Sequence, residues 1–448
     1  MQHRIPIEEL GAHGRAMADA AAMCVHCGFC LPTCPTYQVL GEEMDSPRGR
    51  IYLMKGVLEG ELDARAVAAH VDRCLGCLAC ESACPSGVPY HRLLLPYRAA
   101  TADKVRHPFL ARARRRLALS TLPYRRRFRI AVRAGRLTRR LRPVVPAALR
   151  PMLDLVPDRL PTAEPIPETI PAVGARRARV ALLIGCVQEV LEPEINRATI
   201  DVLTRNGVEV VVPGGQGCCG ALGWHVGEID DARMHARRLL SAFPRDVDAI
   251  IVNAAGCGSG IKDYPLMFAG QPEEAAAREL AERAVDVSVF LDRLGILPPP
   301  PLEAPLRVAY HDACHLCHAQ QVRSEPRRLL RAIPGLELVE LDDGERCCGS
   351  AGTYNIDQPE IAGELGRMKA DAVRRTGADL VALGNIGCMV QIRAHLGANG
   401  KGRPIPVLHT VQVLSLAYAG RLTSVLPPRG DADGDRCRAP SPVPARAG

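Results

Sequence analysis

Residues 24–35 read CVHCGFCLPTCP, and residues 74–85 repeat the same spacing in CLGCLACESACP. Both runs follow the order C-x2-C-x2-C-x3-C-P, in which three neighbouring thiolates bind three irons of one 4Fe-4S cube and the fourth, before proline, binds the other cube. A structural zinc ion needs two pairs of thiolates and leaves the third evenly spaced cysteine without a role. The two runs therefore predict two 4Fe-4S clusters, and a pair of such clusters in one unit indicates electron transfer.

Each predicted cluster takes three cysteines from one run and the last cysteine of the other. We expect cluster 1 to be bound by Cys24, Cys27, Cys30 and Cys84. We expect cluster 2 to be bound by Cys74, Cys77, Cys80 and Cys34. His26 lies inside the first run and is expected to be a partly exposed residue of the loop.

The composition is that of a globular protein whose thiols are clustered. Its 448 residues give room for two or three domains, and its 18 cysteines are too few per residue for a small disulfide-stabilised secreted fold. Residues 1–20 lack the apolar core of a signal peptide, and no later run approaches the roughly 18 apolar residues of a spanning helix. We therefore expect a soluble, cytoplasmic chain with reduced thiols.

The formal charge of +8 is unevenly distributed, because residues 104–150 hold sixteen Lys or Arg and no Asp or Glu. Arginines alternate there with apolar residues, among them Tyr124 and Phe128, as in a basic amphipathic helix that binds an anionic membrane surface. We prefer this interpretation, which predicts peripheral contact with the inner face of the cell membrane. An acidic partner subunit and a solvated charged linker are the alternatives. Nucleic-acid binding is not expected, since no recognition, helicase or nuclease motif accompanies the arginines.

From about residue 176 the chain repeats three landmarks at offsets near 130 residues. Each half has a cysteine at the end of a predicted strand, a vicinal Cys-Cys-Gly and another strand-end cysteine. The first half contributes Cys186, Cys218, Cys219 and Cys257. The second half contributes Cys314, Cys347, Cys348 and Cys388. Repetition argues against a role as core filler and predicts metal binding, with Gly220 and Gly349 in tight turns that let the backbone approach an inorganic group.

Short apolar runs alternate with helical patterns in both halves, which predicts parallel sheets covered by helices. Ligands bind beyond the carboxyl ends of such strands. The four strand-end thiols should therefore converge on one crevice, and they are Cys186, Cys257, Cys314 and Cys388. His225, His311 and His315 flank the motifs and are candidates for relaying a proton to a quinone or a reduced product. Cys317 and Cys437 are expected to be spare thiols.

The repeated motif resembles the cysteine-rich CCG domains of heterodisulfide reductase and its relatives. With the ferredoxin runs, residues 1 to about 420 resemble the family of glycolate oxidase iron-sulfur subunits. The resemblance rests on CVHCGFCLPTCPTYQVLG, SPRGRIYL, CCGSAGTY and NIGC. It implies that a separate FAD subunit oxidises glycolate to glyoxylate, and that electrons pass through the two cubanes and the CCG site to a membrane quinone.

The motif departs from the wider CCG pattern at its end. In heterodisulfide reductase the motif ends in C-x2-C and holds a non-cubane cluster. Here the position three residues after Cys257 is Gly260, and the position three residues after Cys388 is Gln391. A fifth ligand is therefore missing from each half. Four thiolates per half leave three possibilities open, namely an ordinary cubane, a cluster shared across the pseudo-dyad, or no cluster.

No dinucleotide fingerprint or flavin-binding loop stands out, so we expect no catalytic residues in this chain and FAD only in the partner. Two alternatives to the glycolate assignment remain. The chain could serve a D-lactate or an anaerobic glycerol-3-phosphate dehydrogenase as its iron-sulfur subunit. It could instead be a heterodisulfide reductase-like thiol/disulfide oxidoreductase.

The expected fold is an α+β multidomain chain. Residues 1–100 form a mainly helical two-cluster ferredoxin-like domain, and residues 101–175 form the basic segment and a proline-rich linker. Two pseudo-repeated α/β units with parallel sheets follow at residues 176–300 and 301–425. Residues 426–448 are expected to be disordered.

Overall fold

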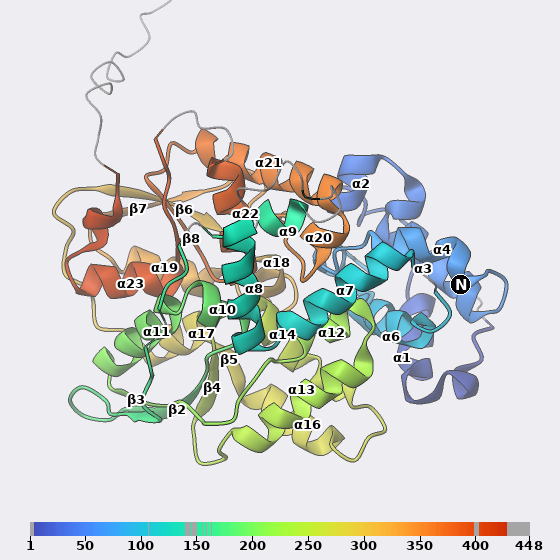
Figure 1. Ribbon diagram of the computed structural model, residues 1–448, viewed down its shortest axis with the longest axis horizontal. Coiled ribbons are helices and arrows are strands. Elements are labelled where there is room, and N and C mark those ends of the chain that lie inside the picture. The colour runs from blue at the N-terminus through green and yellow to red at the C-terminus, as the bar shows by residue number, and fades with distance from the viewer. Residues whose placement is uncertain are drawn as a thin grey trace, which may run out of the picture.

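The computed structural model describes residues 4–105, 107–138, 145, 150–154, 156–157, 159–162, 164–397 and 403–427. Cys437 and the predicted disordered tail beyond residue 427 lie outside these ranges. Across the described residues, no helix combines the length and the apolar character that crossing a bilayer requires. Figure 1 shows helices at one end of the molecule, two sheets at the other, and a pair of helices lying over the middle.

The N-terminal unit is helical, as predicted. Its elements are η1 (Ile7–His13), α1 (Gly14–Ala22), α2 (Pro35–Leu40), η2 (Glu43–Asp45), α3 (Pro47–Leu58), α4 (Ala64–Asp72), α5 (Ala79–Ser82) and α6 (His91–Thr101). Helix α3 begins where Ser46 accepts a hydrogen bond from the Gly49 N–H and Pro47 occupies the first turn. Met17, Met54 and Leu93 are fully buried between α1, α3 and α6.

The first sheet has the order β1-β3-β2-β4-β5, and the second has the order β7-β6-β8-β9. All neighbours are parallel except β1 and β3. The strands of the first sheet are β1 (Thr169–Ile170), β2 (Ala178–Leu183), β3 (Val208–Val211), β4 (Ala249–Val252) and β5 (Ala284–Asp286). Those of the second are β6 (Leu306–His311), β7 (Leu336–Glu340), β8 (Leu380–Leu383) and β9 (Val407–His409). The predicted fold class is confirmed.

Helices cover the two sheets and join them. In the first unit they are α10 (Val187–Leu191), α11 (Glu194–Arg205), α12 (Ala221–Val226), α13 (Ile229–Ala242), α14 (Ala255–Lys262), α15 (Tyr264–Met267), α16 (Glu274–Arg283) and α17 (Val287–Leu294). In the second they are α18 (Cys314–Cys317), α19 (Ser324–Arg331), α20 (Tyr354–Asp357), α21 (Pro359–Arg375), α22 (Ile386–Gly397), α23 (Thr410–Tyr418) and η5 (Leu422–Val425). Helix α11 packs on α23, and α17 packs on α19.

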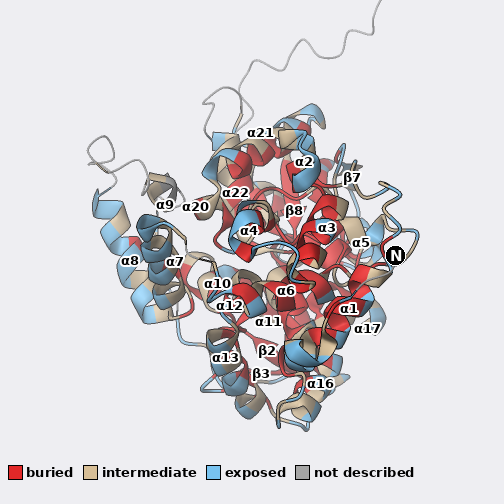
Figure 2. Ribbon diagram, turned by 90° about the vertical axis from the view of Figure 1, so that its right-hand side faces the viewer, coloured by how far each residue is buried: buried red, intermediate tan, exposed pale blue. Residues whose placement is uncertain are grey.

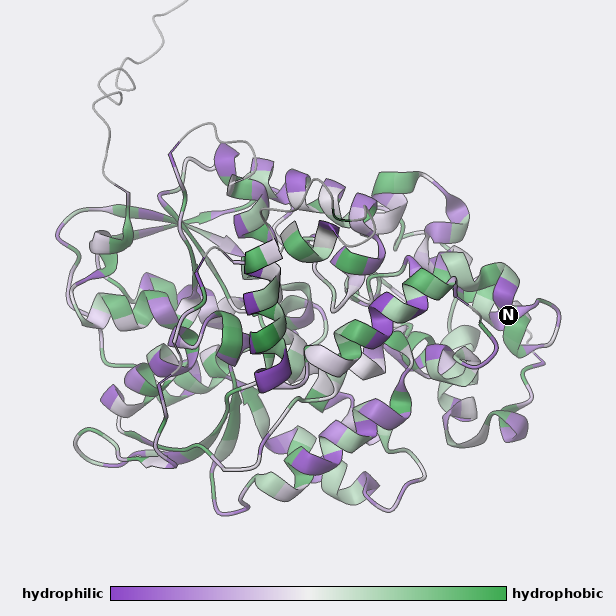
Figure 3. Ribbon diagram, viewed as in Figure 1, coloured by the Kyte–Doolittle hydropathy of each residue, from purple (hydrophilic) through white to green (hydrophobic). Residues whose placement is uncertain are grey.

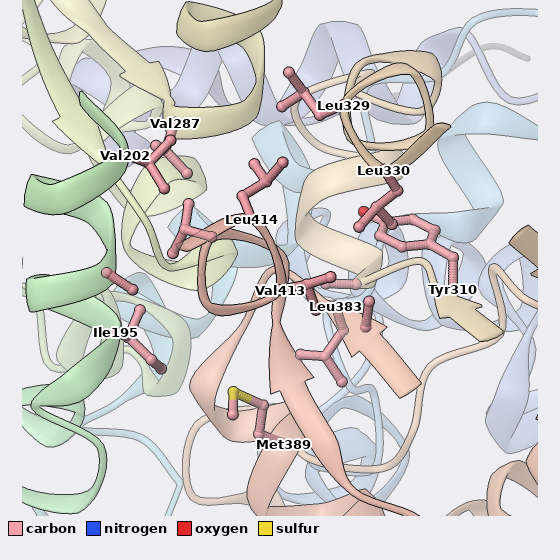
Figure 4. Close-up of a cluster of buried hydrophobic side chains, with 14 of the residues drawn as sticks. Ile195, Val202, Val287, Tyr310, Leu329, Leu330, Leu383, Met389, Val413 and Leu414 are labelled. Carbon is pink, nitrogen blue, oxygen red and sulfur yellow. The ribbon is translucent and has the colours of Figure 1, made fainter. Parts of the chain in front are cut away.

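The two repeats therefore share one hydrophobic core. Figure 4 shows side chains of both units meeting there, with Val202 and Val287 from the first and Leu330 and Leu414 from the second. The N-terminal unit is joined to both, because α6 lies against α12 and α2 lies against α21. This packing fixes the two predicted clusters relative to the repeated cysteine motifs.

The segment expected to be a basic stretch and a linker contains more structure than the sequence indicated. The arginine-rich residues form two helices, α7 (Phe109–Thr121) and α8 (Arg125–Thr138), with Pro123 between them. A short α9 (Arg150–Asp154) follows, and β1 adds an antiparallel edge to the first sheet. A two-residue strand has no detectable alternation of apolar and polar residues, so the sequence carries no signal for it.

Candidate iron-sulfur sites

The ferredoxin cysteines line two neighbouring cavities. One small cavity is lined by Cys24, Cys27, Cys30 and Cys84. A neighbouring cavity is lined by Cys34, Cys74, Cys77 and Cys80. Cys80 also borders the first cavity, so the two sets adjoin. All 17 cysteines of the described residues are free thiols. Four thiols around each cavity fit the donor set of a 4Fe-4S cube.

The two ferredoxin loops share a backbone shape that sequence inspection misses. The third and fifth positions of each run have left-handed backbone angles, at His26 and Gly28 in the first run and at Gly76 and Leu78 in the second. A left-handed conformation is costly for a residue with a side chain and persists only where the surroundings enforce it. In the second run the Gly76 N–H donates to Cys74 Sγ at 3.4 Å. His26, which the sequence suggested to be an ordinary loop residue, occupies the position that glycine takes in the other run.

Cluster 2 has a buried cation beside it. The Arg50 guanidinium, fully buried, lies 3.8 Å from Cys34 Sγ and donates to Asp45 Oδ1 at 3.2 Å. Burial opposes its charge, but the nearby thiols and the Asp45 carboxylate raise the pKa of Arg50 overall. Tyr90 donates its hydroxyl to Cys74 Sγ at 3.7 Å. Such hydrogen bonds and charges stabilise thiolate ligands and set the reduction potential of the group they hold.

The four cysteines of each repeat lie together. Of the four strand-end thiols expected to share one crevice, Cys186, Cys257 and Cys314 line a common cavity and Cys388 does not. We call Cys186, Cys218, Cys219 and Cys257 the first quartet, and Cys314, Cys347, Cys348 and Cys388 the second quartet. The single cysteines of both lie just after strand ends, in or next to the first turn of α10, α14, α18 and α22, and the vicinal pairs lie in the loops before α12 and α20. In the first quartet, hydrogen bonds with Cys218 and Cys257 hold the pKa of Cys219 well below its usual range.

The second quartet has the same connections. Cys314 Sγ lies 3.8 Å from Cys347 Sγ, and the Asn385 amide donates to Cys388 Sγ at 3.4 Å. Hydrogen bonds with Cys347 and Cys388, and then with His311, hold the pKa of Cys348 well below its usual range. Thiols that share protons in this way are deprotonated together when a metal binds. Each quartet therefore offers a compact set of four sulfur donors.

Gly220 and Gly349 let the backbone of the Cys-Cys loops approach the backbone of a neighbouring helix closely. Both have positive φ, and an added Cβ would lie 2.5 Å from the Ala232 carbonyl oxygen at Gly220 and 2.7 Å from the Ala362 oxygen at Gly349. The glycines therefore let each Cys-Cys loop lie directly on the second helix after it, α13 or α21. An approach of backbone to an inorganic group, which we expected from the sequence, stays a prediction.

The place of the missing fifth ligand is filled differently in the two halves. At Gly260 an added Cβ would lie 2.4 Å from Ala221 Cβ, so a cysteine there requires α12 to move. Gln391 is buried and donates its amide to the Ala362 oxygen at 2.9 Å. Cys317, the spare thiol, is fully buried and donates to the Cys314 oxygen at 3.7 Å.

A cavity of about 310 Å³ lies between the N-terminal unit, the two repeats and α7. The whole first quartet, Cys74 and Cys314 line it, together with Arg98 and the arginines of the inner side of α7. His225 and His315 also line it, with ring centroids 4.9 Å apart. Burial lowers the pKa of both imidazoles, that of His315 to about 4. His311 does not reach the cavity and lies within the second quartet instead.

The predicted clusters adjoin the repeated motifs. Leu75 and Cys77 pack in one buried group with Cys314 and Cys347. The Tyr354 hydroxyl donates to the Arg73 oxygen at 2.8 Å, which ties the second repeat to the loop of cluster 2. His318 adds a further link that the sequence did not suggest, with Nδ1 2.9 Å from Ser82 Oγ. The four sets of thiols thus form one continuous series inside the molecule.

Comparison with protein families agrees with both cysteine systems. Residues 20–88 match the model of a 4Fe-4S dicluster domain. Residues 180–262 and 308–393 each match the model of the cysteine-rich CCG domain. The chain is therefore an iron-sulfur protein with one ferredoxin-type region and two CCG regions.

Relatives of known name match most of the chain. The glycolate oxidase iron-sulfur subunit of Escherichia coli (strain K12) is 36% identical over 417 residues, covering 92% of this chain and 98% of that protein. The probable glycolate oxidase iron-sulfur subunit of Bacillus subtilis (strain 168) is 37% identical over 422 residues, covering 90% and 94%. Lactate utilization protein A of Oceanobacillus iheyensis is 31% identical over 246 residues, covering 54% of this chain and 98% of that protein. Similarity at this level over nearly the whole length shows that the chain belongs to the family of glycolate oxidase iron-sulfur subunits, as an electron-transfer subunit of an oxidoreductase.

Proposed function

We propose that this chain receives electrons from an FAD-bearing partner that oxidises glycolate, and passes them through clusters 1 and 2 and the quartets to a quinone in the cavity. The observation that carries the proposal is the unbroken series of thiols. Cys80 borders both ferredoxin cavities, Cys77 packs with Cys314, and Cys74 lines the cavity together with the first quartet. Iron-sulfur groups supply one-electron transfer, and a series of them needs short steps.

The cavity suits a small two-electron acceptor. At about 310 Å³ it lies at the low end of the range for ligand pockets. Arg98 fixes one wall, because it donates to the Cys74 oxygen at 2.7 Å and to the His225 oxygen at 2.7 Å. These two hydrogen bonds of Arg98 connect the loop of cluster 2 to the first repeat. Guanidinium groups along one wall favour carbonyl oxygens that gain negative charge on reduction.

The pair α7–α8 supports contact with a membrane. Their inner side is anchored, since Arg114 pairs with Asp357 at 3.4 Å and Arg125 donates to the Gln216 oxygen at 3.1 Å. Their outer side exposes five large apolar side chains beside arginines, namely Phe109, Leu110, Leu117, Ile130 and Leu137. Figure 2 shows both helices at one edge of the molecule with exposed outer turns, and Figure 3 shows hydrophilic and hydrophobic segments alternating along them.

An outer face of this composition fits an anionic lipid surface, where apolar side chains enter the headgroup region and each nearby cation contributes on the order of 1 kcal/mol. Because α7 also forms a wall of the cavity, contact with the membrane would bring the cavity close to lipid-soluble quinone. We propose that the protein binds at the inner face of the cell membrane.

The function is tested by co-purifying the chain with its partner subunits and assaying glycolate, D-lactate and glycerol 3-phosphate with a water-soluble quinone analogue. We expect a bound flavoprotein and the fastest reduction with glycolate. Purification without a flavoprotein would reject the proposal. If the quinone analogue is reduced faster with D-lactate or glycerol 3-phosphate, that compound and not glycolate is the substrate. If the isolated chain reduces a disulfide, a thiol/disulfide oxidoreductase is favoured.

Membrane contact is tested with vesicles of phosphatidylcholine and phosphatidylserine. The variant R116Q/R126Q/R133Q removes three arginines of the outer face that are exposed and make no contact in the cavity. We expect its affinity for the vesicles to fall at least about tenfold. A matched control, R245Q/R278Q/R331Q, removes the same charge from exposed positions elsewhere and should bind as the parent does. Equal binding of the two variants would contradict the proposal.

A further inference from the structure

The ferredoxin unit has a second apolar surface that lies outside the proposed membrane face. Fourteen large apolar residues are exposed among the described residues, and five of them fall within residues 23–52. They are Met23, Val25, Phe29, Met44 and Tyr52, and we call this set the cluster 1 face. An exposed patch of this kind marks an interaction site, and methionine and aromatic side chains are enriched at the centres of protein interfaces.

The members of the cluster 1 face are linked to the first cysteine loop by contact or by sequence. Val25 and Phe29 line the cavity of cluster 1. Tyr52 contacts His26 of the same loop edge to face, with ring centroids 6.4 Å apart. Met23 directly precedes Cys24. Met44 follows Glu43, whose carboxylate holds Arg48.

The loop beneath this face is held in one shape. Arg48 donates to the His26 oxygen at 3.2 Å and to both carboxylate oxygens of Glu43, at 2.7 and 3.2 Å. An added Cβ at Gly28 would lie 2.8 Å from the Arg48 guanidinium, so the glycine leaves the space that this contact needs. A surface that is already ordered loses little conformational entropy when a partner binds.

The exposure of the thiols indicates where electrons enter the chain. Cys27 is the one exposed cysteine among the 17 in the described part of the chain, whereas Cys77, Cys314, Cys347 and Cys348 are buried. Val25 and Phe29, which flank Cys27 in the loop and line the same cavity, are 66% and 67% exposed. A large redox protein that must come close to a thiol of this chain can therefore do so here, at the start of the thiol series that ends at the cavity.

Charge separates this surface from the outer face of α7–α8. The arginine at its rim, Arg48, is neutralised by Glu43, and Lys55 is neutralised by Glu59. These two paired cations attract anionic lipid less than unpaired ones would, whereas a partner protein with a matching apolar surface needs no excess of cations to bind. We propose that the cluster 1 face is the docking site of the FAD-bearing subunit, placed so that the flavin lies next to Cys27. This inference rests on the proposed function and specifies where its electrons enter.

The test uses the co-expressed complex. The variant V25D/F29D puts two charges into the apolar centre, and we expect it to weaken binding of the FAD subunit at least about tenfold. The control V173D/L297D changes two apolar residues of similar exposure outside the patch and should bind as the parent does. Iron content and the paramagnetic signal after dithionite must match the parent, which excludes loss of cluster 1 as the cause. Unchanged affinity of a V25D/F29D protein with intact iron would overturn the inference.

A second variant changes no residue of the cysteine loop itself. Tyr52 lies on α3 and is 59% exposed, so a photo-reactive p-benzoylphenylalanine at position 52 should cross-link to the FAD subunit. Cross-linking to a second copy of this chain, or no product from an assembled complex, would overturn the docking site. If the parent chain assembles with no flavoprotein, the proposed function fails instead, so the two failures are distinguishable.

Discussion

The two quartets have nearly the same cysteine spacing and different surroundings. The first quartet opens onto the cavity, whereas Cys314 is the member of the second quartet that reaches it. Three residues near the second quartet are polar or charged where the first repeat has apolar ones at the matching position. The pairs are His311 and Leu183, Lys369 and Leu239, and Asn385 and Ala254. His235, near Cys219, is the reverse case, since Leu365 matches it.

This difference indicates that the two quartets have different roles in electron transfer. A nearby cation such as Lys369 favours the more negative state of an iron-sulfur group and so raises its reduction potential, whereas burial alone disfavours that state. The second quartet, next to Cys77 of cluster 2, is suited to accept electrons from it. The first quartet, exposed to the cavity, is suited to pass them to a small molecule. Under the proposed function, the second quartet acts as an internal carrier and the first as the site that reduces the small molecule.

Removing one cysteine pair at a time should separate these tasks, and it has the largest expected effect. In C347S/C348S we expect glycolate to reduce clusters 1 and 2 while quinone reduction falls more than about a hundredfold, because the next carrier is lost. In C218S/C219S the same overall loss should occur with the second quartet still reduced. Iron analysis and freeze-quench paramagnetic resonance distinguish the two. Full turnover in either variant would contradict the assignment.

The Lys369 ammonium is the clearest physical difference between the quartets. It is buried and donates to the Asp343 oxygen at 2.8 Å and the Gly344 oxygen at 3.0 Å. In K369M these carbonyls lose their donor, which should cost about 1–3 kcal/mol of unfolding free energy. Loss of the cation should also lower the reduction potential of the second quartet, as measured by redox titration.

The control for this variant is K262M. Lys262 is an exposed lysine of the first repeat that donates to the Ala281 oxygen at 2.6 Å, and no thiol is among the groups that shift its pKa. K262M should leave the potential unchanged. An unaltered potential in K369M would show that the lysine has a structural role alone.

Sequence patterns predicted the parts of this site that local spacing determines. The ferredoxin runs and the strands that end before the single cysteines follow from short-range spacing and periodicity. Lys369 could not be identified, because it lies 21 residues beyond Cys348 and reaches the quartet through packing of α21. The left-handed His26 and the two-residue β1 also gave no signal, since neighbouring elements impose both conformations.

The last strand of each sheet ends in a buried helix cap, and the two caps have opposite acid-base character. His409 caps α23 by accepting from the Val411 N–H at 3.2 Å, and burial lowers its pKa to about 4. The unfolded chain therefore takes up a proton below about pH 6.5 while the folded chain does not, and stability is lost as the pH falls through that window. We expect a loss of about 2 kcal/mol between pH 7 and pH 5, measured by urea unfolding. H409N should flatten this dependence.

Asp286 holds the matching position in the first repeat and should produce a smaller change of opposite sign. Its carboxylate accepts from the Ser288 N–H at 2.8 Å at the start of α17, and burial raises its pKa to about 6. The folded chain keeps its proton above the unfolded value of 3.8, so this contribution is complete at low pH and is lost as the pH rises through about 6. Between pH 5 and pH 7 the cost should be about 1 kcal/mol. D286N retains a good cap without the charge, so its stability relative to the parent should increase with pH. A parallel pH dependence in D286N and the parent would show that Asp286 is ionised in the fold, and that the two caps do not differ as their burial implies.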